Sequence, residues 1–165
     1  MAALSIEVWT GTYLRRGVAP MFARHVLDCY APAAVAARLA SDGDATVVAE
    51  AEEGPIGYVT VSSRNPGPIP ACGAAEVTTL YLQPRHHGRG IGAVLLGRGL
   101  DILARDGADR AWLTTNAENA PAIGFYGRMG FRNVGRTDYL IDGVGYPNVI
   151  LVRSGLSDDA AGSSP

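Results

Sequence analysis

The chain has 165 residues, of which 47% are apolar and 18% are charged, with a formal net charge of -2. This length suits one globular domain, large enough to remove roughly 70% of the unfolded chain's surface from water. The balanced charge argues against nucleic-acid binding, which normally appears as a basic patch on a basic domain. No apolar run approaches the ~18 residues that span a bilayer, and MAALSIEVWT is not a signal peptide, so a cytoplasmic protein without membrane contact is expected.

The first third of the chain is predicted to be helical and then to enter a sheet. Helices are expected over 21–30 and within 31–40, where Pro32 suits a first turn. Segments 45–50 and 56–61, joined by EEGP, are typical of a β-hairpin. The segment SSRNPGPIPACG contains three prolines and two glycines, which predicts a surface loop. Cys29 and Cys72 are far apart and outside any CxxC pattern, so neither a disulfide nor a metal site is expected.

The central part is predicted as strand 74–82, a connection over 83–89, a helix to about residue 105, and strand 110–115. This succession is typical of a right-handed crossover between parallel strands. Asn119 is expected to cap the next helix, with Pro121 in its first turn and Gly130 just beyond its end. Strands 131–141 and 146–153 follow, joined by DGVG. We expect one domain over 1–153 and a disordered tail over 154–165.

The stretch QPRHHGRGIGAVLL places Gly88, Gly90 and Gly92 where the central helix begins. A glycine inside a helix costs about 1 kcal/mol relative to alanine, so the cluster needs a compensating reason. Either a phosphate approaches the free N–H groups of the helix start, or the helix packs tightly on the sheet. GRGIGA matches GxGxxG/A, but PRHH separates it from the strand and no acidic residue closes the next strand, so a dinucleotide site is not indicated.

Two motifs together resemble the GNAT superfamily of N-acyltransferases. LYLQPRHHGRGIGAVLL is similar to its acyl-CoA pyrophosphate loop, with the pattern Arg/Gln-x-x-Gly-x-Gly/Ala. NAENAPAIGFYGRMGF is similar to its asparagine and tyrosine segment. The resemblance spans roughly residues 45–153 and departs at His87, where the pattern has Arg or Gln, which leaves the role of that side chain open.

The resemblance implies an α/β (α+β) fold. Its mixed, mostly antiparallel sheet would have roughly six to seven strands, with a parallel central pair splayed at the cofactor and about four flanking helices around one core. The implied cofactor is acetyl-CoA. Leu82 would donate its backbone N–H to the thioester carbonyl. The implied cofactor-binding residues are Leu80, Tyr81, Leu82, His87, Gly88, Arg89, Gly90, Ile91, Gly92, Ala93, Asn119 and Tyr126.

Attack of an amine on a thioester requires a neutral amine, a donor to the oxyanion and a proton for the leaving thiolate. By resemblance, Tyr126 is the general acid; by itself it would read as a core tyrosine. Glu76 lies where some family members carry a general base, and it is expected to share a strand face with Leu80 and Leu82. An exposed strand end is an equally supported interpretation of Glu76. Asn119 is equally a plain helix cap.

The expected activity is transfer of an acetyl group from acetyl-CoA to a primary amine, by direct attack in a ternary complex. The helical start, GYVTV and DYLIDGVGYPNVILVR look like the small-amine and polyamine branch. The alternatives are a protein N-terminus or lysine as acceptor, and a non-catalytic acyl-CoA sensor. The sequence leaves open the acceptor, the acyl chain preference and the oligomeric state, a homodimer included.

Overall fold

A six-stranded sheet forms the centre of the fold in this computed structural model, which describes residues 1–14 and 17–157. Its strands run in the order β1-β2-β3-β4-β6-β5, and every neighbouring pair is antiparallel except β3 with β4. This confirms the predicted mixed sheet with one parallel central pair. The strands are β1 (Asp44–Ala51), β2 (Gly54–Ser62), β3 (Glu76–Leu82), β4 (Arg110–Asn116), β5 (Arg132–Ile141) and β6 (Val144–Ser154).

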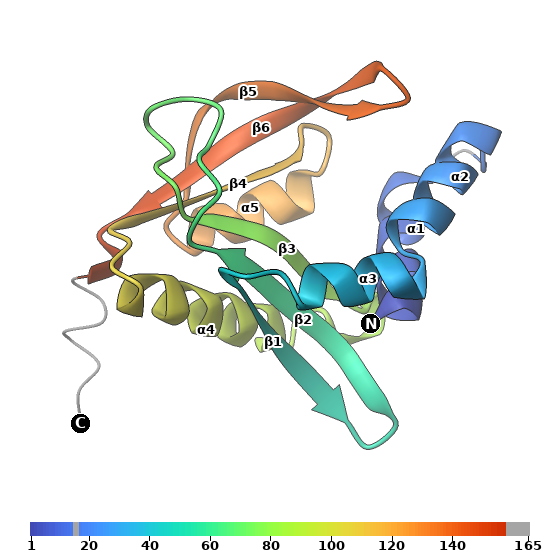
Figure 1. The fold of residues 1–165 in the computed structure, drawn as a ribbon, viewed down its shortest axis with the longest axis horizontal. Helices are drawn as coiled ribbons and strands as arrows, with labels where there is room; N and C mark the ends of the chain where they lie inside the picture. The colour runs from blue at the N-terminus through green and yellow to red at the C-terminus, as the bar shows by residue number, and fades with distance from the viewer. Residues whose placement is uncertain (15–16, 158–165) are drawn as a thin grey trace.

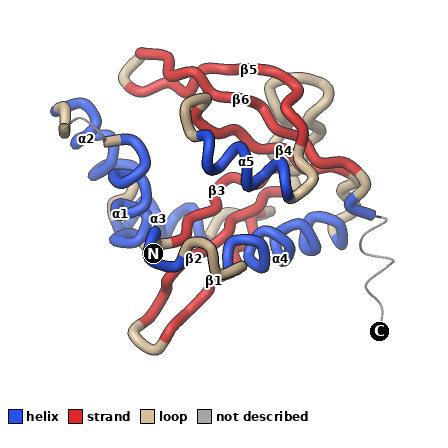
Figure 2. The backbone as a smooth tube through the Cα atoms, turned by 180° about the vertical axis from the view of Figure 1, so that it is seen from behind, coloured by secondary structure: helices blue, strands red, loops and turns tan. Residues whose placement is uncertain are grey.

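Helices cover both faces of this sheet. The described residues form α1 (Ala2–Tyr13), α2 (Pro20–Cys29), α3 (Pro32–Leu39), α4 (Ile91–Arg105), α5 (Ala120–Arg128) and a short 3-10 helix, Pro84–His86. α4 and α5 lie on one face (Figure 2), where leucines of α4 pack against Val59 and Val61. α1, α2 and α3 contribute to a second cluster on the opposite face, together with Tyr81 and Ile141. No helix in these ranges combines the length and the apolar character that a membrane crossing requires.

The parallel strands β3 and β4 are joined at one end and separated at the other. In the described part of the chain, the ladder between them consists of the pair Glu76 and Trp112, next to a hydrogen bond from Trp112 N–H to Ala75 O at 2.9 Å. Beyond this point the strands diverge, and Figure 1 shows the sheet opening toward α1 and α2. The predicted splay is therefore confirmed.

Helix α1 was not among the four helices expected from the sequence. Its β-branched residues alternate with polar ones, which is a strand-like pattern, and its apolar residues form no single helical stripe. The helix is stabilised by tertiary contacts, because Leu4 and Trp9 are buried. Two threonine hydroxyls also bond inside the helix, from Thr10 to Ile6 O at 2.6 Å and from Thr12 to Val8 O at 2.8 Å.

A β-bulge in β3 corrects the predicted placement of Glu76. The β2 residues Thr60 and Val61 pair with Thr79 and Val77, so Thr78 is an extra residue in β3. A bulge reverses the alternation of side chains beyond it. Glu76 therefore does not share a face with Leu80 and Leu82, which lie on the α4 side; it shares a face with Thr79 and Tyr81. We call this second face, the one on which α1 packs, the acceptor face.

The end of the chain is packed as far as Leu156. This side chain is buried, and its N–H donates to Asp109 O at 3.0 Å. The tail for which disorder is expected, 154–165, lies mainly outside the described residues, which end at 157.

Candidate active site

The glycine loop between β3 and α4 owes its composition first to backbone conformation. Gly88 and Gly90 have φ values of +74° and +80°, a left-handed region that strains residues with a Cβ atom. A Cβ atom at either position would meet no other atom within 4 Å. Tight packing of the helix on the sheet therefore does not explain these two glycines. The two glycines are required by the left-handed backbone conformation, and the space beside them is open.

The start of α4 presents unpaired backbone donors. Within the described residues, no hydrogen bond uses the N–H groups from Gly88 to Gly92, whereas Ala93 donates to Gly90 O at 3.0 Å. α4 also has no side-chain cap and no acidic residue in its first turn. The partial positive charge of the helix start is thus not neutralised. Such a site fits the phosphate groups of a nucleotide-like ligand.

Two side chains around this loop have structural partners that the sequence did not reveal. His87 Nε2 donates to Leu82 O at 3.0 Å and so fastens the loop to the end of β3. Glu7 of α1 accepts hydrogen bonds from Gln83 Nε2 at 2.7 Å and Arg85 Nη2 at 2.8 Å. The pKa of Glu7 is lowered, chiefly by the hydrogen bond from Gln83 and to a smaller extent by Arg85. Glu7 was missed because α1 itself was not predicted.

Three elements converge beside the glycine loop. A Cβ atom on Gly92 would lie 3.7 Å from Phe125 Cζ and 3.9 Å from Leu82 Cδ2. The end of β3, the start of α4 and the middle of α5 therefore meet at one place. Tyr126 follows Phe125 on α5, with ring centroids 5.3 Å apart. The structure thus brings Leu82, the glycine loop and α5 together.

Tyr126 has a buried ring and an unbonded hydroxyl. Its residue exposure is 9%, and no described residue forms a hydrogen bond with its hydroxyl. In the described part of the chain, every fully buried side-chain oxygen or nitrogen has a partner. The hydroxyl must therefore reach accessible space. Burial, and to a smaller extent the neighbouring Tyr13, raise the pKa of Tyr126, so the group stays protonated at neutral pH. This state suits a proton donor.

Asn119 caps α5 in the way that the sequence predicts. Its Oδ1 accepts a hydrogen bond from Ala122 N–H at 3.3 Å. The side-chain Nδ2 has no partner among the described residues. A contact of Asn119 with the cofactor stays a prediction, and it would have to use this nitrogen.

Glu76 lies at the closed end of the splay, apart from the glycine loop. It begins β3 and Leu82 ends it, so their Cα atoms are about 20 Å apart at a rise of about 3.3 Å per residue. Asn65 Nδ2 donates to Glu76 Oε2. Burial raises the pKa of Glu76, the bond from Asn65 opposes this shift, and Asp44 adds to it. Any exchange of a proton between Glu76 and a group near Leu82 would have to pass through water.

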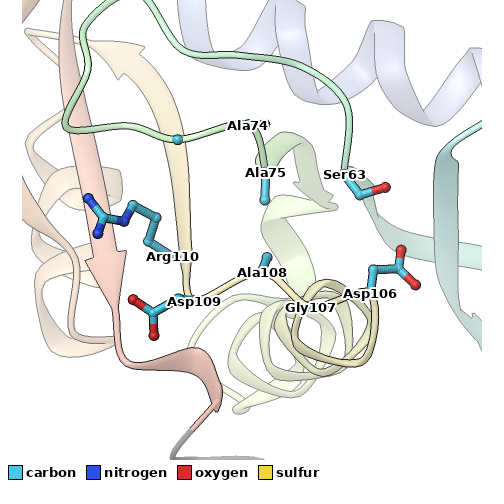
Figure 3. Close-up of a pocket in the computed structure, with 9 residues that line it drawn as sticks. Ser63, Ala74, Ala75, Asp106, Gly107, Ala108, Asp109 and Arg110 are labelled. Carbon is cyan, nitrogen blue, oxygen red and sulfur yellow. The ribbon is translucent and has the colours of Figure 1, made fainter.

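A separate hollow lies at the far end of α4 (Figure 3). It has a volume of about 290 Å³, and its lining includes Ser63, Ala75, Asp106 and Arg110. At about 1.5 Å per residue, the length of α4 places it about 22 Å from the glycine loop. None of the residues expected from the sequence to act in the site lines this hollow.

The sequence of the chain is similar to those of known acetyltransferases. The model of the acetyltransferase (GNAT) family matches residues 12–131. The chain is 46% identical over 61 residues to a mycothiol acetyltransferase of Clavibacter michiganensis subsp. michiganensis, covering 37% of this chain and 20% of that protein. It is 39% identical over 67 residues to a streptothricin acetyltransferase of Streptomyces lavendulae, covering 41% of this chain and 35% of that protein. The matched regions thus span only about a fifth to a third of these relatives.

Solved structures share the fold. The PaiA N-acetyltransferase of Thermoplasma acidophilum, in complex with coenzyme A, superposes with a TM-score of 0.70 at 22% identity, over 93% of this chain and 89% of that one. A nourseothricin acetyltransferase superposes with a TM-score of 0.59 at 29% identity, over 69% of this chain and 66% of that one.

Proposed function

The chain belongs to the acetyltransferase (GNAT) family, and on that premise we propose that it transfers an acetyl group from acetyl-CoA to a primary amine of a small molecule. The observation that carries the proposal is the convergence beside the splay. The unpaired N–H groups of the glycine loop, the end of β3 and helix α5, which carries Tyr126, come from separate parts of the sequence.

The loop is suited to acetyl-CoA, which supplies an activated acetyl thioester. The N–H groups from Gly88 to Gly92 would bind its phosphate oxygens, and the start of α4 would add its dipole. Arg89 is exposed beside them, while Arg85 is held by Glu7. His87 would act indirectly, because its ring holds the loop in place. The N–H group of Leu82 would orient the thioester carbonyl.

The splay gives the two faces of the sheet a common opening. Tyr126 belongs to the α5 side, and Glu76 belongs to the acceptor face. We assign Tyr126 the role of giving its hydroxyl proton to the leaving sulfur. We assign Glu76 the role of receiving, through water, the proton that the attacking amine loses. One proton is thus removed at nitrogen and one is delivered at sulfur, on opposite sides of the sheet.

The test is an assay of thiol release with acetyl-CoA and a panel of acceptors. The panel contains small amines, a peptide with a free N-terminus and a peptide with an internal lysine. We expect thiol release that depends on a small amine, with the acetylated amine detected by mass spectrometry. Acetyl-CoA binding without release for any acceptor would instead indicate a non-catalytic binding protein. Turnover restricted to the peptides would identify a protein acetyltransferase.

A further inference from the structure

Three hydrogen-bonding side chains form one row across the acceptor face. Asn148 of β6 pairs with Asn116 of β4 on one side and with Thr137 of β5 on the other. We call these three residues the amide row. Trp112 and Ile150, which point to the same face, pack with Cys72 of the loop between β2 and β3. The row lies at the end of β4 where the splay is open (Figure 1).

Asn148 is buried without a protein partner. Its exposure is 7%, and no described residue forms a hydrogen bond with its side-chain amide. Because every fully buried polar side-chain atom in the described ranges has a partner, the amide atoms must touch accessible space. An amide that is nine-tenths buried and unbonded destabilises the fold unless something outside the chain satisfies it. The amide is therefore available to a ligand.

The amide row and the two rows beside it contain no charged side chain. The adjacent row toward the closed end consists of Thr114, Ile150 and Gly135. The adjacent row toward the β5–β6 turn consists of Tyr139 and Tyr146. None of these residues carries a charge at neutral pH, so the three rows contain no carboxylate to pair with a second ammonium group of a polyamine.

Helix α2 closes this region on the side of the two tyrosines. Tyr146 lies against Phe22 of α2 with ring centroids 5.5 Å apart, and Tyr139 Oη is 3.3 Å from His25 Nε2. On the other side, the loop between β2 and β3 covers Ile150. The amide row thus lies between the contacts that hold α2 and the contacts that hold the loop, and it takes part in neither.

We propose that Asn148, flanked by Asn116 and Thr137, binds hydroxyl groups of the acceptor, which is therefore a hydroxylated amine and not a polyamine. This inference rests on the proposed function, because it assumes that the acceptor face receives the amine. An amide offers both a donor and an acceptor, and a hydroxyl group is also both. Hydroxyl groups can therefore pair with both Oδ1 and Nδ2 of Asn148, whereas an ammonium group, which only donates, leaves Nδ2 unpaired.

The test compares two acceptors that differ only in hydroxyl groups, 3-amino-1,2-propanediol and propylamine, in wild type and in Asn148→Leu. Leucine has nearly the same volume and no hydrogen-bonding group. We expect kcat/KM for the diol to fall about 10- to 100-fold, the loss typical of an unpaired buried polar group. For propylamine, kcat/KM of the variant should stay within about threefold of the wild-type value. Affinity for acetyl-CoA should not change. Asn133→Leu, on the exposed part of β5, is the matched control and should affect both amines equally.

Each outcome decides a different point. Equal losses for both amines in a folded Asn148→Leu protein would overturn the inference and make Asn148 a structural residue. If that variant does not fold, the wild-type preference decides: better turnover of spermidine, or of propylamine, than of the diol would overturn it. Asn148→Asp gives a second measurement, since its added carboxylate should shift the preference toward spermidine. Absence of turnover with every acceptor would instead overturn the proposed function.

Discussion

The two faces of the sheet are built on different principles. On the α4 and α5 side, the candidate cofactor site consists mainly of backbone groups held in a set conformation by Gly88 and Gly90. On the acceptor face, the candidate site consists of side chains such as Glu76 and Asn148 that reach it from separate strands. A backbone site can serve the whole family, because it depends on few side chains. A side-chain site can change with each acceptor, and for this reason the two faces should respond differently to substitution.

Tyr126 should give the largest effect. Tyr126→Phe is expected to lower kcat by about 100- to 10,000-fold, the usual contribution of general acid catalysis. Because its hydroxyl has no protein partner, the free energy of unfolding should fall by no more than about 0.5 kcal/mol. Affinity for acetyl-CoA, measured by calorimetry, should be unchanged.

Tyr58→Phe is the matched control for this experiment. It removes a hydroxyl bonded to Ser5 at 2.8 Å, so it should cost about 0.5 to 1.5 kcal/mol of stability while kcat stays the same. Turnover of Tyr126→Phe within about threefold of wild type, far below the loss that general acid catalysis implies, would make Tyr126 a core residue.

Glu76 should have the next largest effect, and only on the rate. Glu76→Gln keeps an oxygen that can accept the hydrogen bond from Asn65, so the loop between β2 and β3 should stay in place. We expect kcat to fall about 100-fold at neutral pH and to recover partly at high pH, where more of the amine is already neutral. A pH profile with the wild-type shape would leave Glu76 as a residue that holds this loop.

The pH dependence of stability offers an independent check of the environment of Glu76. Its pKa is raised in the folded state above the ordinary value of 4.5, chiefly by burial. The contribution of this group to stability is therefore fully present below pH 4.5 and is lost as the pH rises through the folded pKa. Relative to Glu76→Gln, wild type should lose stability over that window and reach a plateau above it. Denaturant titrations at several pH values would measure the difference, and a constant difference would contradict the burial.

The backbone nature of the cofactor site can be tested by comparing two glycines. Gly90→Val and Gly107→Val both place a side chain at positive φ, +80° and +87°, with no other atom within 4 Å of the new Cβ. Each should cost about 1 to 2 kcal/mol of stability. Only Gly90→Val should weaken acetyl-CoA binding, by about tenfold or more, which corresponds to about 1.4 kcal/mol. Equal acetyl-CoA affinities of the two variants would show that the glycine loop does not bind acetyl-CoA.

Asn119 should show the smallest effect, divided between stability and binding. Asn119→Ala removes the cap of α5 and should cost about 1 kcal/mol. Asn119→Asp keeps the capping oxygen and removes Nδ2, so stability should return while acetyl-CoA affinity falls a few-fold. If Asn119→Asp binds acetyl-CoA with wild-type affinity, then Asn119 acts only as the cap of α5.

The sequence by itself determined the parts whose cause is local. The glycine spacing, the position of Asn119 before Pro121, and the alternation of the terminal strands predicted the loop, the cap of α5 and the β5–β6 pair within a few residues. Each depends on backbone conformation or on neighbours along one element, which a single segment can specify. The family resemblance relies on the same local motifs.

Tertiary structure alone decided the features that join distant segments. Helix α1 forms because Leu4 and Trp9 are buried by other elements, and only then does Glu7 reach Arg85. The bulge at Thr78 moved Glu76 to the other face, because it depends on the register with β2 and not on β3 alone. Asn148 is an unremarkable strand residue in the sequence. Its side-chain amide becomes a candidate binding group only because β4 and β5 flank it on both sides in the sheet, so that it is buried without a hydrogen-bond partner. This environment is set by three-dimensional packing.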